Sequence, residues 1–171
     1  QGEANITSPW TVDINGKTLS TRNIIIATGA RPFVPPIKGI EQVNYLTSDN
    51  LWEIREQPKR LVVLGGGPIG CELTQAFARL GSHVTQIEML PRIMIREDEE
   101  IAAMVTERFQ KEGVDIRTQH VAKEVVVKDN KKILICEHND QTVEIEFDEI
   151  LVAVGRAANT SGFGLEELGV E

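Results

Sequence analysis

The stretch GGGPIG, residues 65–70, contains the residue types and spacing that could bind a phosphate. Gly65, Gly67 and Gly70 follow the apolar run RLVVL and precede an amphipathic segment. In a dinucleotide site the first such glycine makes a tight turn, the second lets the backbone approach a pyrophosphate, and the third lets a helix pack closely on a strand. The stretch therefore predicts cofactor contacts from Gly65, Gly66, Gly67, Pro68, Ile69 and Gly70. A glycine-rich turn with no ligand is the alternative at this point.

An acidic residue provides a second test of this interpretation. Glu88 lies 18 positions after Gly70, at the end of the next apolar segment, HVTQIEM. A carboxylate there can accept hydrogen bonds from the hydroxyls of an adenine ribose, and its charge would repel a 2′-phosphate. The sequence thus favours NAD over NADP, although Arg92, just beyond Pro91, could accommodate such a phosphate. Taken alone, Glu88 is equally well explained as a solvated charge at a strand end.

Alternating strands and helices are needed to position these residues, and the sequence contains them. We expect buried strands over residues 60–65, 83–89 and 114–118, with helices over 68–80 and 98–113. Parallel strands need such long return connections, and these are right-handed. Two apolar stripes would hold the helices against the sheet. They consist of Ile69, Leu73, Phe77 and Leu80 in the first helix, and of Ile101, Met104, Val105 and Phe109 in the second.

Beyond residue 120 the pattern changes. Residues 121–129, 131–139 and 141–148 are strand-like and are joined by polar turns, which predicts an antiparallel meander without helices. Another buried strand is expected over 149–155, and residues 156–171 should form a loop with a short helical turn. The predicted fold class is α/β, with a three-layer Rossmann-like parallel sheet and an inserted antiparallel β-meander.

The part of the chain before residue 55 is predicted to contain little helix. A hairpin with strands over residues 10–14 and 17–21 is indicated by the Asn-Gly dipeptide between them. Residues 23–29, NIIIATG, form an apolar, β-branched run typical of a buried strand. The prolines of residues 30–39 indicate a linker, and residues 43–54 predict a short strand followed by a short helix capped near Ser48 or Asp49.

Composition excludes several classes of function. The 171-residue chain has 26 acidic and 18 basic residues, a formal net charge of −8, and no basic run that could track a nucleic acid. It contains neither a stretch of about 20 apolar residues nor a signal-peptide pattern, so we expect no membrane contact and a cytoplasmic location. Cys71 and Cys136 are too far apart for a CxxC motif and the three histidines are dispersed, so no metal site is expected.

Two further segments resemble each other, NIIIATGARP at residues 23–32 and EILVAVGRAAN at residues 149–159. Each is an apolar run followed by a small residue, a glycine, and an arginine within two positions. Glycine at such a point permits close approach of the backbone to a ligand. A strand followed by a turn would explain either segment alone, but a pair that flanks a dinucleotide motif favours a functional role.

Together, IIIATGARPFVPPIKG, VVLGGGPIGCELTQAFARLGSHVTQIE and EILVAVGRAANT resemble a known family, the FAD- and NAD(P)-dependent pyridine nucleotide-disulfide oxidoreductases. The sequence is most similar to the branch that includes dihydrolipoamide dehydrogenase and mercuric reductase, and the likeness covers essentially the whole chain. The resemblance implies three regions. They are a remnant of an FAD-binding domain over residues 1–33, an NAD(P)H-binding domain over 34–155, and a return segment toward the FAD domain over 156–171.

The resemblance also implies roles for single residues. They are Thr28, Gly29 and Ala30 for FAD, and Glu72, Val121 and Gly155 for NAD(H). Gly155 would lie near the nicotinamide half of the cofactor, and Val121 on its adenine side. Glu72 matches a family carboxylate beside the nicotinamide, although a first-turn glutamate favoured by the helix dipole explains it equally well.

Several motifs of the family are absent from this sequence. They are the FAD-binding GxGxxG near the start, the CxxxxC redox pair, the later GD motif for flavin, and the dimerisation domain with its His-Glu pair. Cys71 cannot replace the pair and is expected to be a small packing residue. We therefore expect an NAD(H)-binding part, without a catalytic residue of its own, of a homodimeric flavoprotein that passes hydride from NADH to FAD.

Other functions are compatible with parts of this pattern. Within the same class, the whole protein could be an NADH oxidase or a ferredoxin reductase without redox cysteines. A non-catalytic NAD-sensing module is a further alternative, but the flavin-type ATG segment argues against it because a sensor does not need one. A methyltransferase on a similar sheet is disfavoured by the close-packed third glycine, Gly70.

Overall fold

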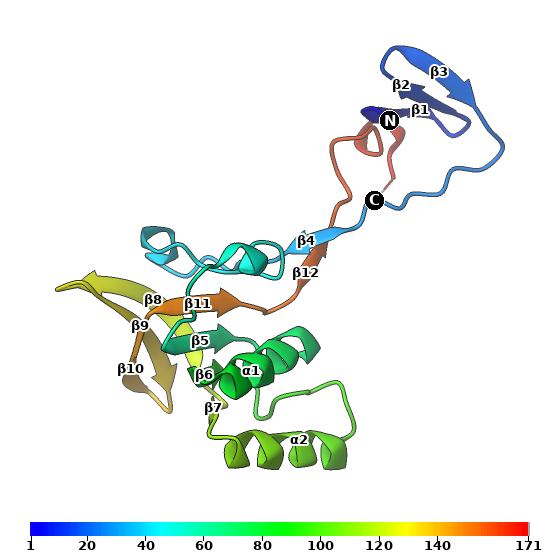
Figure 1. Ribbon diagram of the computed structural model, residues 1–171. Helices are drawn as coiled ribbons and strands as arrows, with labels where there is room; N and C mark the ends of the chain where they lie inside the picture. Colours follow the sequence, from blue (N-terminus) through cyan, green and yellow to red (C-terminus); the bar gives the residue numbers. More distant parts are fainter. Residues whose placement is uncertain (171) are drawn as a thin grey trace. The chain divides into compact units, whose positions relative to one another are not determined.

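Four parallel strands form the central sheet of residues Pro32–Arg156, in the order β11-β5-β6-β7 (Figure 1). The strands are β5 (Arg60–Leu64), β6 (His83–Ile87), β7 (Asp115–Arg117) and β11 (Glu149–Val152). Each begins within one residue of its predicted start, because these apolar runs can be buried on both faces of a sheet. The computed structural model describes residues 1–170.

Two helices connect the parallel strands. Helix α1 (Pro68–Leu80) begins directly after the glycine stretch and ends at Gly81, whose φ of 103° is the left-handed conformation that favours glycine. Helix α2 (Glu99–Lys111) begins at Asp98, whose side chain accepts a hydrogen bond from the Glu100 N–H. Both predicted helices are therefore confirmed, with ends within two residues of the expected ones.

The buried faces of the helices differ from the predicted stripes. In α1 the buried residues are Gly70, Cys71, Thr74 and Phe77, whereas Ile69 and Leu80 are exposed. In α2 the buried residues are Ala102 and Phe109, whereas Ile101 and Met104 are exposed. Two residues of each predicted stripe are nevertheless confirmed, since Phe77 and Phe109 are buried and Leu73 and Val105 pack against the core. The predicted stripes were wrong at Ile69, Leu80, Ile101 and Met104, and in α1 small side chains occupy the contact because the helix backbone approaches the sheet closely.

The side chain of Glu112 joins the C-terminal ends of the two helices. Its carboxylate accepts hydrogen bonds from Arg79 and Gln75 of α1 and from Arg108 of α2. The hydrogen bond from Arg79 is the main reason why the pKa of Glu112 falls to about 2. This polar link holds α1 and α2 together at the end of the helices that lies away from the glycine stretch.

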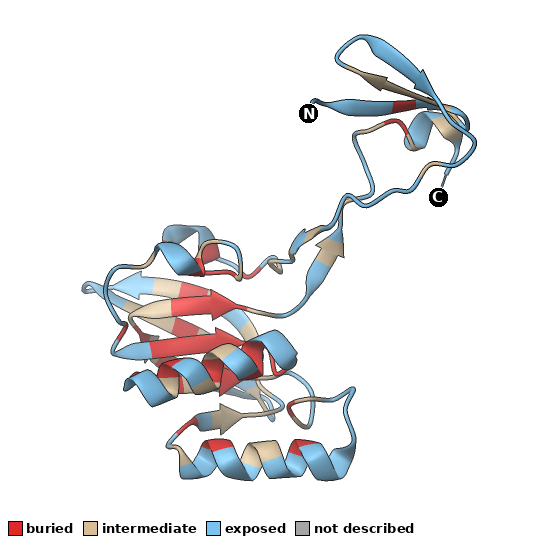
Figure 2. Ribbon diagram, turned by 45° about the vertical axis from the view of Figure 1, so that its right-hand side comes forward, coloured by how far each residue is buried: buried red, intermediate tan, exposed pale blue. Residues whose placement is uncertain are grey.

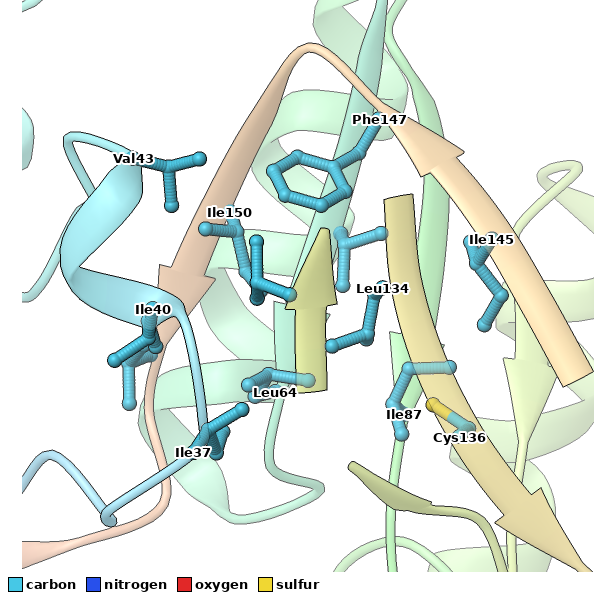
Figure 3. Packing of buried hydrophobic residues seen from close by; sticks show 13 residues of the cluster. Ile37, Ile40, Val43, Leu64, Ile87, Leu134, Cys136, Ile145, Phe147 and Ile150 are labelled. Atoms are coloured by element: carbon cyan, nitrogen blue, oxygen red, sulfur yellow. The ribbon is translucent and has the colours of Figure 1, made fainter. Parts of the chain in front are cut away.

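A three-stranded antiparallel sheet, with the order β10-β9-β8, packs against the same core. Its strands are β8 (Val121–Lys128), β9 (Lys131–His138) and β10 (Gln141–Phe147). Two-residue turns with positive φ connect them, as is usual in tight hairpins. The predicted meander is confirmed. Figure 3 shows Leu134 and Phe147 of this sheet facing Leu64 and Ile150 of the parallel sheet.

The segment before β5 covers part of the same core. Ile37, Ile40 and Val43 are buried there (Figure 3), so the proline-rich segment is packed at its end and not only a linker. Figure 2 shows the buried positions of the parallel strands and the exposed outer faces of the two helices. Leu46 forms a parallel bridge to Leu151 at the edge of the sheet. The predicted short strand is thus a single bridge.

Short 3-10 helices replace the regular structure expected in this segment. They are η1 (Ile40–Gln42) and η2 (Leu51–Glu53). The predicted helix capped near Ser48 or Asp49 is therefore only the single turn η2, and it follows Asn50. The Asn50 side chain accepts a hydrogen bond from the Thr47 N–H and thereby closes the preceding turn.

Residues Gln1–Arg31 and Ala157–Glu171 make up a second, smaller unit. Its sheet contains β1 (Ala4–Ser8), β2 (Thr11–Ile14) and β3 (Lys17–Ser20), all antiparallel. Asn15 and Gly16 have φ of 51° and 77°, which confirms the predicted hairpin turn. A 3-10 helix, η3 (Glu166–Leu168), forms the expected helical turn near the end of the chain.

The prediction of a buried strand over residues 23–29 is wrong for the structure described here. These residues form no strand, and Ile25 and Ile26 are 90% and 47% exposed. An apolar run becomes a buried strand only when neighbouring strands bond to it. Regular structure resumes with β4 (Ala30–Pro32), which pairs with β12 (Arg156–Ala158). Among residues 1–170 no helix is long and apolar enough to cross a bilayer.

Candidate functional site

The glycine stretch forms the turn between β5 and α1, and the fold itself requires glycine at both of its ends. Gly65 has a φ of 109°, and a β-carbon there would overlap the Ala153 carbonyl oxygen. A β-carbon at Gly70 would overlap the Gly65 carbonyl oxygen, so α1 approaches the end of β5 without any side chain between them. These two glycines are thus explained by close packing within the protein.

Gly66 is surrounded by the residues that follow β6. A β-carbon there would lie 2.9 Å from both the Glu88 Oε2 atom and the Ile93 side chain. The Gly66 N–H donates to Glu88 Oε2 at 2.6 Å, and its carbonyl accepts from the Met94 N–H at 2.6 Å. The loop after β6 is therefore fastened to the glycine turn by two backbone groups of one residue.

Gly67 differs from the other three glycines. Its φ of −77° is accessible to any residue, and a β-carbon would meet nothing within 4 Å. No partner occurs in the described residues for its N–H, and the N–H groups of Ile69 and Gly70 belong to the first turn of α1, where no intrahelical acceptor exists. The turn thus presents unpaired donors beside an open space at the positive end of a helix.

Glu88 lies directly after β6, at the carboxyl end of the parallel strands, and is partly buried. Its Oε1 atom accepts from the Leu90 N–H at 2.8 Å, while Oε2 accepts from Gly66. Two backbone donors therefore fix the orientation of the carboxylate beside the glycine turn. Each carboxylate oxygen can accept a further hydrogen bond, so the group remains able to bind a hydroxyl.

Arg92 lies in the loop after Glu88 and is bound to that loop. Its guanidinium group donates to the carbonyl oxygens of Met94, Ile95 and Glu97 at 2.7, 3.1 and 3.0 Å. These bonds close residues 92–97 into a compact turn, from which the buried Ile93 packs against Gly66. The sequence left Arg92 as a candidate phosphate ligand, and the structure shows that three of its donors are used within its own loop.

Cys71 and Gln86 lie beneath the glycine turn. Cys71 is buried in the first turn of α1, and burial is the main reason why the pKa of its thiol is raised. Gln86 Nε2 donates to the Gly65 carbonyl at 3.1 Å and lies 3.5 Å from Cys71 Sγ. Cys71 is therefore a packing residue, as the sequence predicts, and not a reactive thiol.

Three further residues were predicted to contact NAD(H), and the structure gives each of them a different surrounding. Val121 begins β8 directly after His120, whose N–H donates to the Glu88 carbonyl at 3.0 Å. Gly155 has a φ of 141° and follows Ala153, whose carbonyl touches Gly65. The structure thus brings Val121 toward Glu88 and Gly155 toward Gly65. Glu72 is exposed and lies just beyond the first turn of α1, a turn that contains no acidic residue.

The predicted flavin residues belong to the smaller unit, where Asn159 holds them. Thr28 Oγ1 donates to the Asn159 carbonyl at 2.5 Å, and the Asn159 N–H donates to the Gly29 carbonyl at 3.0 Å. Gly29 has a φ of 71°, and a β-carbon there would meet nothing within 4 Å. The residues from Thr28 to Ala30 thus form a defined backbone turn, and their contact with flavin stays a prediction.

Sequence reasoning missed Gln86, Ile93 and Met94, although they contact the glycine turn directly. Gln86 carried a signal, because an amide inside an otherwise apolar strand must find a partner when it is buried. Ile93 and Met94 carried none, since their position depends on the left-handed turn at Met94, where φ is 53°. The sequence also treated all histidines as dispersed, whereas the rings of His120 and His138 stack with centroids 4.1 Å apart.

Comparison with known proteins gives a consistent result. The family model described as pyridine nucleotide-disulphide oxidoreductase matches residues 1–171. The chain belongs to this family. It is similar to other members of the family both in sequence and in fold.

Three relatives illustrate this similarity. The chain is 37% identical to mercuric reductase of Staphylococcus aureus, matching 100% of this chain and 31% of the relative. It is 38% identical to dihydrolipoyl dehydrogenase of Thermus scotoductus, over 100% of this chain and 38% of that protein. The structure of the HOCl-induced flavoprotein disulfide reductase RclA from Escherichia coli matches with a TM-score of 0.85 at 31% identity. This match covers 98% of the chain and 38% of RclA.

The chain spans about a third of the length of these relatives. It is therefore similar to one part of an oxidoreductase of this family. The mixed α/β fold, with its parallel sheet and its antiparallel strands, is shared with the flavoprotein disulfide reductase.

Proposed function

We propose that residues Pro32–Arg156 bind NAD(H) on a Rossmann-type sheet and present it to FAD in a flavin-dependent oxidoreductase. The observation that carries this proposal is the contrast among the glycines. Gly65, Gly66 and Gly70 are explained by contacts within the protein, whereas Gly67 faces open space with unpaired N–H groups around it. A pyrophosphate approaching the start of α1 would explain why a glycine is present there.

Charge supports NAD(H) rather than NADP(H) as the ligand. The Glu88 carboxylate is fixed beside the glycine turn by two backbone N–H groups and would accept hydrogen bonds from the ribose hydroxyls. A 2′-phosphate in the same place would meet this negative charge. Arg92 would not compensate for it, because its guanidinium group is held by the carbonyl groups of its own loop.

Other residues of the chain would orient the two cofactors. Val121 would contact the adenine, whereas Gly155 would let the backbone approach the nicotinamide and Glu72 would lie beside that ring. Thr28, Gly29 and Ala30 would contact FAD in the whole protein, which we propose to be a homodimer like its family. FAD, when bound, supplies the acceptor for hydride from the nicotinamide. The residues described here bind and orient, and we expect the chain alone to be inactive.

Titration of the chain with NADH and with NADPH, followed by calorimetry, tests the proposal. We expect saturable binding of NADH and at least about tenfold weaker binding of NADPH, since a pair of unfavourable charges in a partly buried site costs more than 1 kcal/mol. Equal affinities would disprove the role of Glu88 in selecting the cofactor. Absence of NADH binding would disprove the site itself.

Two variants locate the binding site. Gly67→Val places a side chain where a β-carbon meets no atom within 4 Å, so the protein should stay folded and lose most of its NADH affinity. A loss of about 1 kcal/mol in the free energy of unfolding is expected, because valine is less favourable than glycine at the N-cap of α1. Glu88→Gln should reduce the difference between the affinities for NADH and for NADPH, because it removes the negative charge that would repel a 2′-phosphate. Glu99→Gln, which removes an equivalent charge from the first turn of α2, is the matched control and should change neither affinity.

A further inference from the structure

The glycine turn is held from below by a buried amide. Gln86 Nε2 donates to the Gly65 carbonyl at 3.1 Å, and its side chain points to the α1 side of the sheet, where it also meets Cys71 Sγ. From the other direction, the Gly65 N–H donates to the Ile87 carbonyl at 2.8 Å. Consecutive residues of β6 thus fix both polar groups of Gly65, one through its side chain and one through its backbone.

The polar side chain of Gln86 is unfavourable at this buried position. It is 0% exposed and lies on the same face of the sheet as Val63 and Val84, which are also buried. Within residues 1–170 its Oε1 atom has no hydrogen-bond partner. Leaving a buried acceptor unsatisfied is unfavourable, and an apolar side chain of similar size would avoid the loss. The amide therefore satisfies one buried acceptor, the Gly65 carbonyl, and adds another, so its net contribution to stability is small.

The position of the Gly65 carbonyl affects where the first turn of α1 lies. It lies so close to α1 that only glycine fits at position 70, and the left-handed φ of Gly65 sets its direction. A displacement of this carbonyl would therefore shift the first turn of α1. The unpaired N–H groups of Gly67, Ile69 and Gly70 belong to that turn, so their directions depend on it.

We propose that Gln86 is a positioning residue for dinucleotide binding. By holding the Gly65 carbonyl, it fixes the directions of the N–H groups that would receive the pyrophosphate. The unsatisfied Oε1 atom is then the cost of placing a donor under the turn. This inference rests on the proposed NAD(H) function and assigns a further residue to that site, one that touches the binding loop rather than the ligand.

The test compares stability and affinity in one variant. Gln86→Met keeps the length and volume of the side chain but removes both the donor and the unsatisfied acceptor. We expect the urea midpoint of unfolding to change little, because the variant removes the unsatisfied Oε1 atom but leaves the buried Gly65 carbonyl without its donor. The dissociation constant for NADH should increase about 3- to 10-fold, the usual effect of one lost hydrogen bond. A parallel loss of stability and affinity would show a merely structural role and would overturn the proposal.

Thr74→Val is the matched control. Thr74 of α1 is also 0% exposed, and among residues 1–170 its Oγ1 atom is likewise a buried oxygen without a hydrogen-bond partner. Unlike Gln86, it makes no hydrogen bond to the glycine turn. The control should gain stability and keep its NADH affinity. An affinity loss equal to that of Gln86→Met would overturn the proposal, since any change in the buried polar groups would then have the same effect.

Gln86→Glu adds a rescue experiment. A buried carboxyl group has a raised pKa and is protonated at low pH, where its O–H can donate to the Gly65 carbonyl as the amide does. The measured quantity is the ratio of the NADH affinity of this variant to that of the unaltered chain. This ratio should be close to one at about pH 6 and should fall as the pH rises, because the carboxyl group then loses its proton and can no longer donate. A pH-independent ratio would contradict the proposal. If the unaltered chain does not bind NADH, the proposed function fails together with this inference. If the unaltered chain binds NADH and the Gln86 variants bind it equally well, this inference fails alone.

Discussion

Two segments of similar sequence, EILVAVG at residues 149–155 and NIIIATG at residues 23–29, have different structures in this protein. The first forms β11, in which Ile150, Leu151 and Val152 are at most 1% exposed. The second forms no strand, and Ile25 is 90% exposed. Because the two runs have similar length and apolar content, the difference must come from their neighbours.

The neighbours of β11 occupy both of its edges. On one side it pairs with β5 in parallel register, and on the other the Leu46 N–H donates to the Ile150 carbonyl at 2.8 Å. The segment over 23–29 has no such strand partner among the described residues. Its first residue, Asn23, bonds to the neighbouring Thr21, and its last residues are held by Asn159. An apolar β-branched run thus specifies the capacity for burial, while the surrounding strands decide whether burial occurs.

Amide hydrogen exchange should show the largest difference between the two segments. The amides of β11 lie in the centre of a core sheet and should open only with global unfolding, which slows exchange by on the order of a thousandfold or more. The amides of residues 24–26 should exchange nearly as fast as in an unstructured peptide. Strong protection of residues 24–26 would contradict the comparison.

The same substitution in both segments should give the next largest difference. Ile150→Ala removes a fully buried side chain and should lower the free energy of unfolding by about 2–5 kcal/mol, because a cavity remains. Ile25→Ala removes an exposed one and should change it by no more than about 0.5 kcal/mol. Urea unfolding of both variants measures the two effects. Similar losses would mean that Ile25 is buried by contacts that the described structure does not contain.

Much of the fold follows from local sequence signals. The starts of β5, β6, β7 and β11 and the two helices were predicted because apolar runs, the first-turn proline Pro68 and the terminal glycine Gly81 act within a few residues. The buried faces of the helices were predicted only in part. The face of α1 depends on how closely Gly70 approaches the Gly65 carbonyl, and the spacing of apolar residues does not reveal this distance.

The candidate site was predictable to a similar extent. The glycine spacing and Glu88 could be read from the sequence, and the structure brings them together through the hydrogen bond from Gly66 to Glu88. The hydrogen bonds of Arg92 could not be predicted, because its contacts with three nearby carbonyl groups require the left-handed turn at Met94. Sequence alone therefore finds the residues of a site more readily than the residues that hold it in place.

The terminal glycines should show a smaller difference. Both Gly155 and Gly29 have positive φ, at 141° and 71°, and open space around the α-carbon, so only backbone strain opposes a side chain. Gly155→Ala should lower the free energy of unfolding by about 1–3 kcal/mol, because L-residues almost never adopt its φ. Gly29→Ala should cost about 1 kcal/mol or less, since its segment can relax. Urea unfolding measures both variants, and equal costs would contradict the idea that only one segment is held by neighbours.

The smallest effect is expected at Asn159, which holds the end of the exposed segment. The Asn159 side chain donates to the Thr28 carbonyl at 3.0 Å and accepts from Arg31 at 2.9 Å. Asn159→Ala should remove both bonds and accelerate exchange of the amide at position 159 several-fold, since exposed hydrogen bonds contribute about 1 kcal/mol or less. Asn44→Ala, at an exposed position of the larger unit without a positive φ, is the matched control and should leave the exchange at position 159 unchanged. Unchanged exchange at position 159 would mean that the Thr28 turn keeps its shape by itself, and the difference between the two segments would then begin before residue 28.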